Sequence, residues 1–206
     1  MKTDKKKAVQ QSYEMVRDKI LNGQLQSGEK VTEEKLAADL GFSRTPIRDA
    51  IKRLEYEGLI IDKKVVKPSD KDLRNIFQVR MLLEGYSAHY AATYSSPDQL
   101  AILAECVAIG KNGSYEEIME ANERFHQIIV QTSGNDRLID TINRMQSIIY
   151  LFRKTVVFYS RPFLIEEHEE IYNAIRDRRP ERAEELMKQH LEKDLDFCLH
   201  LLNSQK

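Results

Sequence analysis

The sequence predicts a mainly α-helical protein, with an N-terminal winged helix-turn-helix of three helices and a small β-hairpin wing, followed by an all-helical six-helix antiparallel bundle. Three observations predict this fold. Apolar residues recur at spacings of three and four along most of the chain, which is typical of helices that bury one face. Two of these helices are joined near residue 42 by a turn so short that they must cross steeply. A β-branched segment after Gly58 ends at Pro68. The winged domain is therefore expected at residues 1–68 and the bundle at residues 69–206.

The composition is that of a globular protein, with 41% hydrophobic and 32% charged residues among 206. The net charge is −1, but residues 1–70 carry 15 Lys and Arg against 12 Asp and Glu, while the remainder carries 17 against 21. This asymmetry weakly favours contact between nucleic acid and the N-terminal part. The longest apolar runs, such as residues 148–152, are far shorter than the ~20 residues of a membrane helix. We therefore expect a cytoplasmic protein with no membrane partner.

Cap and stop residues place the elements of the first domain. A first helix is expected from Lys7 to Leu21. Thr32 is placed to cap a second helix that Gly41 ends, and after one further residue Ser43 is placed to cap a third. The runs "LII" and "VV" on either side of "DKK" predict the hairpin.

The remaining helices are separated by similar signals. Ser96-Pro97 is a cap followed by proline at the first helical position, and Ser114 with Glu117 forms a capping box. Six helices without strands favour an antiparallel bundle. Their expected ranges begin near residues 70, 97, 115, 136, 162 and 180, and the last ends near residue 202.

The third helix combines an apolar stripe with a cationic one. Ile47, Ile51 and Leu54 recur at core-facing spacing, while Arg44, Arg48 and Lys52 run beside them. The first turn of a helix offers unpaired amides and a positive dipole end, which attract phosphate. Arginine also reads guanine in the major groove, where a helix-turn-helix inserts the start of its second helix. The alternative is an ordinary solvated face, which the short turn and the following wing disfavour.

The segment "GQLQSGEKVTEEKLAADLGFSRTPIRDAIKRLEYEGLI" resembles the DNA-binding domain of the GntR family of bacterial transcriptional regulators. The resemblance implies a dimeric winged helix on a short palindromic operator, with Ser43, Arg44, Thr45 and Arg48 as DNA contacts. Lys52 continues this cationic stripe. Lys63 and Lys64 at the wing are expected to bind phosphates, because the wing tip lacks the glycine that family members often have there.

The rest of the chain resembles the all-helical effector domain of the FadR subfamily, called FCD. The resemblance depends on "VRMLLEGYSAHYAA", "ANERFHQIIV" and "EEHEEIYNAIRDRRPERAEELMKQHL". In this subfamily the effectors are commonly organic acids. A small carboxylate is therefore the expected ligand of the bundle.

Three histidines are the candidate metal ligands of the bundle. His126, His168 and His190 lie on three different expected helices, and imidazole suits divalent transition metals. The resemblance, not the spacing, implies that they converge, with Zn most expected and Ni possible. Metal-binding members have an aspartate four residues before the first histidine, where this chain has Asn122. The alternative is a metal-free polar pocket lined by the same histidines.

Four further residues are candidates for the effector cavity. Arg80 and Glu84 are spaced as an ordinary helix ion pair, but the resemblance places Arg80 at the effector. Tyr150 and Arg153 are expected either to line the bundle or to contact the ligand. A cavity with both a metal and an arginine suits a carboxylate, which both can bind.

Taken together, these features predict a homodimeric transcriptional regulator, expected to be a repressor, that binds DNA and a small organic acid. Dimerisation follows from the spacing of operator half-sites, roughly 34–36 Å. Two alternatives remain open from the sequence. The protein could respond to the metal ion itself, or the three histidines could form the zinc site of a metal-dependent enzyme.

Overall fold

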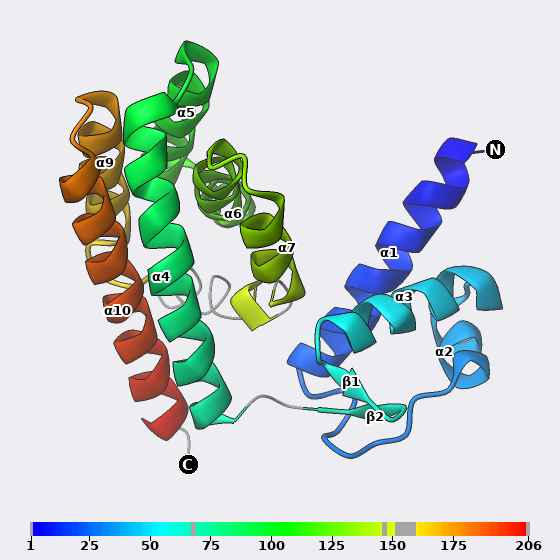
Figure 1. Ribbon diagram of the computed structural model, residues 1–206. Helices are drawn as coiled ribbons and strands as arrows, with labels where there is room; N and C mark the ends of the chain where they lie inside the picture. Colours follow the sequence, from blue (N-terminus) through cyan, green and yellow to red (C-terminus); the bar gives the residue numbers. More distant parts are fainter. Residues whose placement is uncertain (1, 67–68, 146–147, 151–159, 205–206) are drawn as a thin grey trace. The chain divides into compact units, whose positions relative to one another are not determined.

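The computed structural model describes residues 2–66, 69–145, 148–150 and 160–204 (Figure 1). The chain divides into two compact units, Met1–Ser69 with Asn143–Ile148, and Asp70–Ile142 with Ile149–Lys206. The fold is mainly α-helical with one two-stranded sheet, as the sequence predicts. Among the described residues, no helix has both the length and the apolar character needed to cross a membrane.

The first unit contains the predicted helix-turn-helix. Its helices are α1 (Lys2–Leu21), α2 (Glu33–Leu40) and α3 (Arg44–Tyr56). The Thr32 hydroxyl accepts a hydrogen bond from the Lys35 amide at 3.3 Å and caps α2. Gly41 ends α2 with φ of +71°, a conformation that glycine adopts without steric cost. These two residues fix the short turn that sets α3 across α2.

The wing is a two-residue hairpin between β1 (Ile60–Ile61) and β2 (Lys64–Val65). Asp62 and Lys63 both have positive φ, 49° and 58°, which is the type I′ turn that matches the twist of the strands. Lys64 thus lies in the second strand. That strand also pairs on its other edge with residues 29–31, since the Val31 amide donates to the Lys63 carbonyl at 2.8 Å. The sequence predicts only a loop at residues 22–31.

The apolar core of the first unit joins all of its elements. Its buried side chains come from the three helices and the wing: Tyr13, Val16, Ile20, Leu36, Ile47, Leu54, Leu59, Ile60 and Val65. At one edge the Tyr13 hydroxyl donates to Glu57 at 2.9 Å, and Arg53 pairs with the same carboxylate at 2.9 Å. This arrangement packs α1 against the end of α3 and leaves the opposite face of α3 for other contacts.

The second unit contains six described helices: α4 (Asp70–Tyr94), α5 (Pro97–Asn112), α6 (Tyr115–Thr132), α7 (Asp136–Arg144), α9 (Leu164–Arg176) and α10 (Pro180–Ser204). Both predicted caps are present. Ser96 forms a capping box with Gln99, and Ser114 forms one with Glu117. Helices α4 and α10 run antiparallel and pack along their length, α5 packs on α6, and α9 packs on α10 (Figure 1). The interior faces of α4, α6, α9 and α10 therefore meet inside the unit.

Several helix ends differ from those expected. Helix α1 begins at Lys2, five residues before the expected start. Helix α4 extends to Tyr94, one turn beyond the expected end, because Ala91 and Ala92 are fully buried and continue its packed face. Helix α9 begins at Leu164, after Phe163 takes a left-handed conformation with φ of 61°. Local cap signals locate a helix but leave its packed terminal turns undetermined.

Candidate nucleic-acid interface and metal centre

The cationic stripe of α3 is exposed, as the sequence predicts. Pro46, Ile47, Ala50, Ile51 and Leu54 face the core, and the predicted DNA-contacting side chains face outward. All seven of these are exposed: Ser43, Arg44, Thr45, Arg48, Lys52, Lys63 and Lys64. A helix turned in this way presents its first turn and its arginines to a groove.

Ser43 differs from the prediction in one respect. It occupies the N-cap position of α3 with extended backbone, φ of −70° and ψ of 162°, but its hydroxyl makes no capping hydrogen bond. A cap hydroxyl bonds the amide of the second or third helical residue. Here the third residue is Pro46, which has no amide hydrogen. The expectation that the Ser43 side chain caps the helix is therefore wrong, and the hydroxyl is left for another partner.

Arg44 is held by acidic groups at the start of α2. Its guanidinium forms an ion pair with Glu34, and Glu33 lies 3.9 Å away. The side chains of Arg44 and Glu34 are both well exposed, at 65% and 64%. Exposed ion pairs of this kind contribute little to stability, so a phosphate or a base edge can replace Glu34 at small cost.

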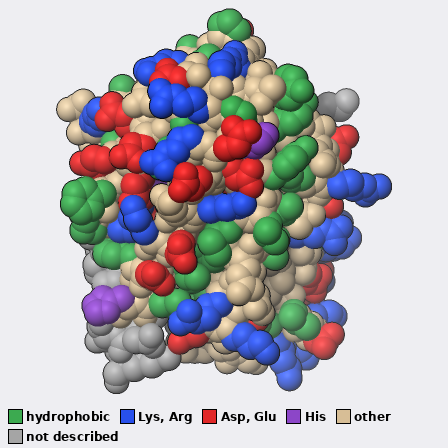
Figure 2. Space-filling model, turned by 60° about the vertical axis from the view of Figure 1, so that its left-hand side comes forward, with side chains coloured by type: hydrophobic (Ala, Val, Ile, Leu, Met, Phe, Trp, Pro, Cys, Tyr) green, Lys and Arg blue, Asp and Glu red, His purple; other side chains and the backbone are tan. Residues whose placement is uncertain are grey.

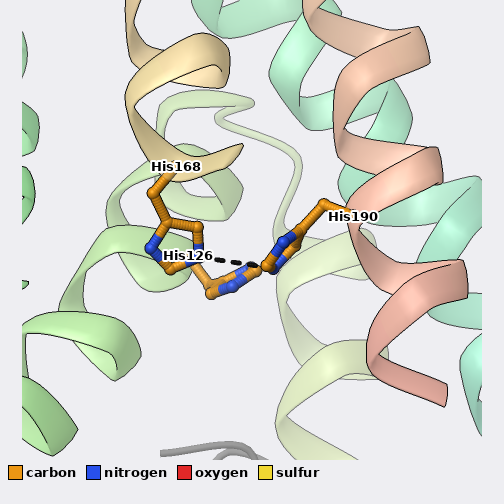
Figure 3. Close-up of side chains that lie close together, drawn as sticks. All are labelled: His126, His168 and His190. Carbon is orange, nitrogen blue, oxygen red and sulfur yellow. Dashed lines mark hydrogen bonds between the residues drawn. The ribbon is translucent and has the colours of Figure 1, made fainter. Parts of the chain in front are cut away.

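Three buried histidines meet in the interior of the second unit (Figure 3). His126 comes from α6, His168 from α9 and His190 from α10, and each is at most 3% exposed. One nitrogen of each ring belongs to a set in which all atoms lie within 4.8 Å of one another. His168 Nε2 and His190 Nε2 are 3.3 Å apart. The structure thus brings together the three histidines that the sequence singled out, in an arrangement that can hold a metal ion.

Carboxylates lie behind two of these histidines. Glu84 Oε2 is 2.7 Å from His126 Nδ1, and Glu167 Oε2 is 2.9 Å from His190 Nδ1. When Nδ1 donates to a carboxylate, Nε2 keeps its lone pair and the ring is fixed in orientation, as in most protein metal sites. Glu84, predicted as an effector residue, lies against His126 in the structure, and its effector role stays a prediction.

Glu167 was not predicted. Burial raises its pKa, but hydrogen bonds from His190, Arg161 and Lys193 outweigh burial and hold the pKa at about 2. Arg161 Nη2 donates to its Oε2 at 2.5 Å, and Lys193 Nζ donates to Oε1 at 3.0 Å. The carboxylate is therefore ionised beside the histidine cluster. An acidic residue directly before His168 was the only sequence signal for it.

Two of the predicted residues have buried polar atoms without partners. Asn122 is 4% exposed, and neither its Oδ1 nor its Nδ2 has a hydrogen-bond partner among the described residues. Arg80 is fully buried, and its Nε donates to Glu84 Oε1 at 2.6 Å. Both of its terminal nitrogens lack a hydrogen-bond partner within the described ranges. Since buried polar groups are rarely left unpaired, these atoms mark places for a ligand or an ion.

The charged groups buried in the second unit form one cluster. Among its described residues, two arginines and three carboxylates are buried: Arg80, Arg161, Glu84, Glu167 and Asp194. Their formal net charge is −1 while the histidines are neutral. Lys193 Nζ, 3.0 Å from Glu167, offsets this charge at the edge of the cluster. The three imidazole nitrogens themselves suit a divalent transition metal.

For the other two predicted effector residues, contact with a ligand stays a prediction. Tyr150 is half-buried, and Arg153 lies outside the described residues. Beside the buried cluster is a pocket of about 380 Å³ that was not predicted, lined by Arg161, Pro162, Phe163, Glu167, Lys193, Asp196, Phe197 and His200.

Figure 2 shows a face on which Lys and Arg side chains alternate with Asp and Glu. Such a mixed surface is not the basic patch that nucleic acid requires.

Comparison with known proteins decides the class of this chain. Residues 8–65 match the family "Bacterial regulatory proteins, gntR family", and residues 75–193 match the FCD domain. The chain belongs to the GntR family and has the FadR-like architecture with an FCD domain. It is a DNA-binding transcriptional regulator and not an enzyme, since these families and the relatives below are regulators of transcription.

Its relatives match over nearly their whole length. The chain is 26% identical over 210 residues to the uncharacterized regulator YdhC of Bacillus subtilis, covering 95% of this chain and 93% of YdhC. It is 25% identical to the Glc operon transcriptional activator of Escherichia coli, covering 93% and 89%. The structure of E. coli McbR/YncC has a TM-score of 0.71 at 20% identity, covering 96% of this chain and 98% of that protein. This last likeness shows the fold alone.

Proposed function

We propose that this protein is a cytoplasmic, homodimeric repressor that binds a palindromic operator. A small organic acid would raise or lower its affinity for that operator. The acid is held in the second unit by a divalent metal ion at three histidines and by Arg80. The observation that carries the proposal is the convergence of His126, His168 and His190 beside a buried arginine, two of whose donor nitrogens lack partners in the described part of the chain.

The residues present fit a metal ion. Three imidazole nitrogens converge, and carboxylates orient two of the rings. The nitrogen-rich ligand set favours Zn, with Ni possible. When bound, such an ion supplies a Lewis acid that attracts carboxylate oxygens. The resemblance implies Asn122 as a neutral fourth group, and its amide oxygen has no hydrogen-bond partner among the residues that the structure describes.

Arg80 favours an anionic effector over sensing of the ion alone. The guanidinium is fully buried, and its two terminal nitrogens lack partners among the described residues. Leaving such buried donors without acceptors costs free energy. A carboxylate can accept hydrogen bonds from both nitrogens with its two oxygens, and such charge-assisted hydrogen bonds are stronger than neutral ones. A regulator that senses only the metal ion does not require a buried arginine beside the metal site.

The DNA-binding role requires two copies of α3. Helix-turn-helix dimers read two half-sites one helical turn apart, and palindromic operators mirror the two-fold axis of the protein. Binding of the acid would favour one arrangement of the two helices, so operator affinity changes. The relatives include an activator and a repressor by name, the Glc operon activator and RspR of E. coli, so the direction needs measurement.

The effector proposal is tested with the metal-loaded protein and a panel of mono-, di- and tricarboxylates. Melting temperature and operator affinity are measured with each acid. We expect at least one acid to shift both, and Arg80→Met to lose the shift while keeping its metal. Arg74→Met, the same change at an exposed position of α4, is the matched control. An operator response to metal with no response to any acid would favour the ion sensor.

The DNA-binding proposal is tested with operator sites selected from random DNA. Arg44→Ala and Arg48→Ala are each expected to cost about 1–3 kcal/mol of operator binding. Arg182→Ala, an exposed arginine of α10, is the control and should bind normally. If both α3 variants bound like the unmodified protein, the assignment of the recognition helix would be wrong.

A further inference from the structure

Asp194 is a buried carboxylate beside the histidine cluster that neither the sequence nor the family resemblance assigns to it. It is 3% exposed and lies one helical turn after His190 on α10, so both side chains point from the same face. Its Oδ2 is 3.5 Å from His190 Nε2. Its Oδ1 is 2.7 Å from Arg161 Nε, in an ion pair without hydrogen-bond geometry.

His190 is therefore enclosed by two carboxylates, with Glu167 at Nδ1 and Asp194 at Nε2. Arg161 Nη2 lies 3.2 Å from the same Nδ1. In the tautomer in which Nδ1–H donates a hydrogen bond to Glu167, Nε2 carries a lone pair that faces the Asp194 oxygen. His168 Nε2 lies 3.3 Å from the same atom. Electron-pair donors this close to one another repel unless a proton or a metal ion lies among them.

The two distances match those between neighbouring ligands of one ion. Zn binds histidine nitrogen at about 2.0–2.1 Å and carboxylate oxygen at about 2.0–2.2 Å, so adjacent ligands of a tetrahedral ion are about 3.3–3.5 Å apart. The His168–His190 and His190–Asp194 distances are 3.3 and 3.5 Å. Asp194 is not in the set whose atoms all lie within 4.8 Å of one another. A rotation of its side chain must bring the oxygen toward the other two histidines.

We propose that Asp194 is the carboxylate ligand of the metal centre, supplying the negative charge that Asn122 cannot supply. This inference depends on the proposed metal function and names a ligand for it. Arg161 forms an ion pair with Asp194 Oδ1, so Oδ2 is the oxygen that would bind the metal. Asn122 is then left to pair with the effector or with the ion as a weaker neutral group.

The charge balance supports a carboxylate among the ligands of this site. Three neutral imidazoles and one amide leave the full charge of a divalent ion in a buried place, which is costly. A carboxylate from α10 halves that charge. It also explains why α10 carries an aspartate in the interior one turn from its histidine, where an apolar residue would otherwise extend the packed face.

The test compares Zn affinity, measured by competition with a chromophoric chelator, in the full chain and in three variants. Asp194→Asn is expected to weaken Zn binding by tenfold or more, since even groups behind the ligands change affinity by about 10–100-fold. The double variant with Asn122→Asp added is expected to recover most of the loss. Asp196→Asn, the same change at an exposed position two residues away, is the control and should bind normally.

The absorption spectrum of the Co(II)-loaded protein is a second readout. Loss of a carboxylate ligand changes the ligand-field bands, whereas loss of an ion pair to Arg161 leaves them unchanged. Normal Zn affinity and an unchanged Co(II) spectrum in Asp194→Asn would overturn the inference and leave the three-histidine site intact. Reduced affinity without a spectral change, and without recovery by Asn122→Asp, would assign Asp194 a structural role only. If the unmodified protein bound no metal, both the metal function and this ligand would be wrong.

Discussion

The buried pair of Arg80 and Glu84 allows a quantitative test of how the second unit holds its charges. Both side chains are fully buried, and Glu84 accepts from Arg80 Nε at 2.6 Å while facing His126 Nδ1 at 2.7 Å. Glu84→Gln keeps the shape but removes the charge, and the terminal nitrogens of the guanidinium already lack partners among the described residues. Breaking a buried ion pair on one side costs about 3–5 kcal/mol. At roughly 2–4 °C per kcal/mol for a chain of this size, the melting temperature should fall by about 6–20 °C.

The assay is thermal unfolding of the metal-free full chain, followed by circular dichroism in the presence of a chelator. The second variant is Arg80→Met with Glu84→Gln, which removes both charges. Because neutral replacement of a whole buried pair is often tolerated, the double variant should recover most of the stability lost in the single one. Glu105→Gln is the control, since its ion pair with Arg124 at 3.0 Å is exposed and should contribute less than about 1 kcal/mol.

Two results would refute this reasoning. If Glu84→Gln melted like the control, Arg80 would have another charge partner that replaces Glu84. If the double variant were less stable than the single one, the loss would come from packing and not from an unpaired charge. In either case Arg80 would no longer be a candidate for binding an anionic ligand.

Three further predictions follow from the geometry. Lys63→Gly should raise stability by about 0.5–1 kcal/mol, because it relieves a left-handed residue, and should weaken operator binding with a salt slope lower by about 1, since a phosphate contact is lost. Unfolding and salt-dependent anisotropy together check it, and unchanged DNA binding would contradict the wing contact. Glu34→Gln should tighten operator binding by about 1.4–5-fold, since Arg44 no longer leaves an ion pair of about 0.2–1 kcal/mol; weaker binding would mean that Glu34 positions Arg44. A chelator should lower the melting temperature of the Zn-loaded protein by several degrees, because the ion binds the folded state. His126→Ala should show no such difference.

The first unit could be predicted in detail because its signals are local. Thr32 and Gly41 are separated by one short helix, and each acts through its own backbone or the next turn. The pairing of residues 29–31 with the wing could not be predicted, because it depends on backbone groups. The segment carries no β-branched alternation that would indicate a strand.

The site in the second unit could be predicted only in part. Its three histidines lie 42 and 22 residues apart, and no spacing rule on one helix relates them. The family resemblance implied their convergence. Glu167, Arg161 and Asp194 were missed because their roles arise from packing between α9, α10 and the segment before α9. A buried charge cannot be told from a solvated one by its position on a helix that also has an exposed face.

The structure also indicates why a metal ion and an acid would act together. The three imidazole nitrogens can bind a cation, and the terminal nitrogens of Arg80, which lack partners among the described residues, can bind an anion. An ion alone occupies the histidine site, and an acid alone pairs with Arg80. Because each reduces the cost of burying the other, acid affinity should rise with metal occupancy. By linkage, any factor by which the acid changes operator affinity is also the factor by which operator DNA changes acid affinity. Measuring acid binding with and without operator therefore tests the coupling without knowledge of the regulated genes.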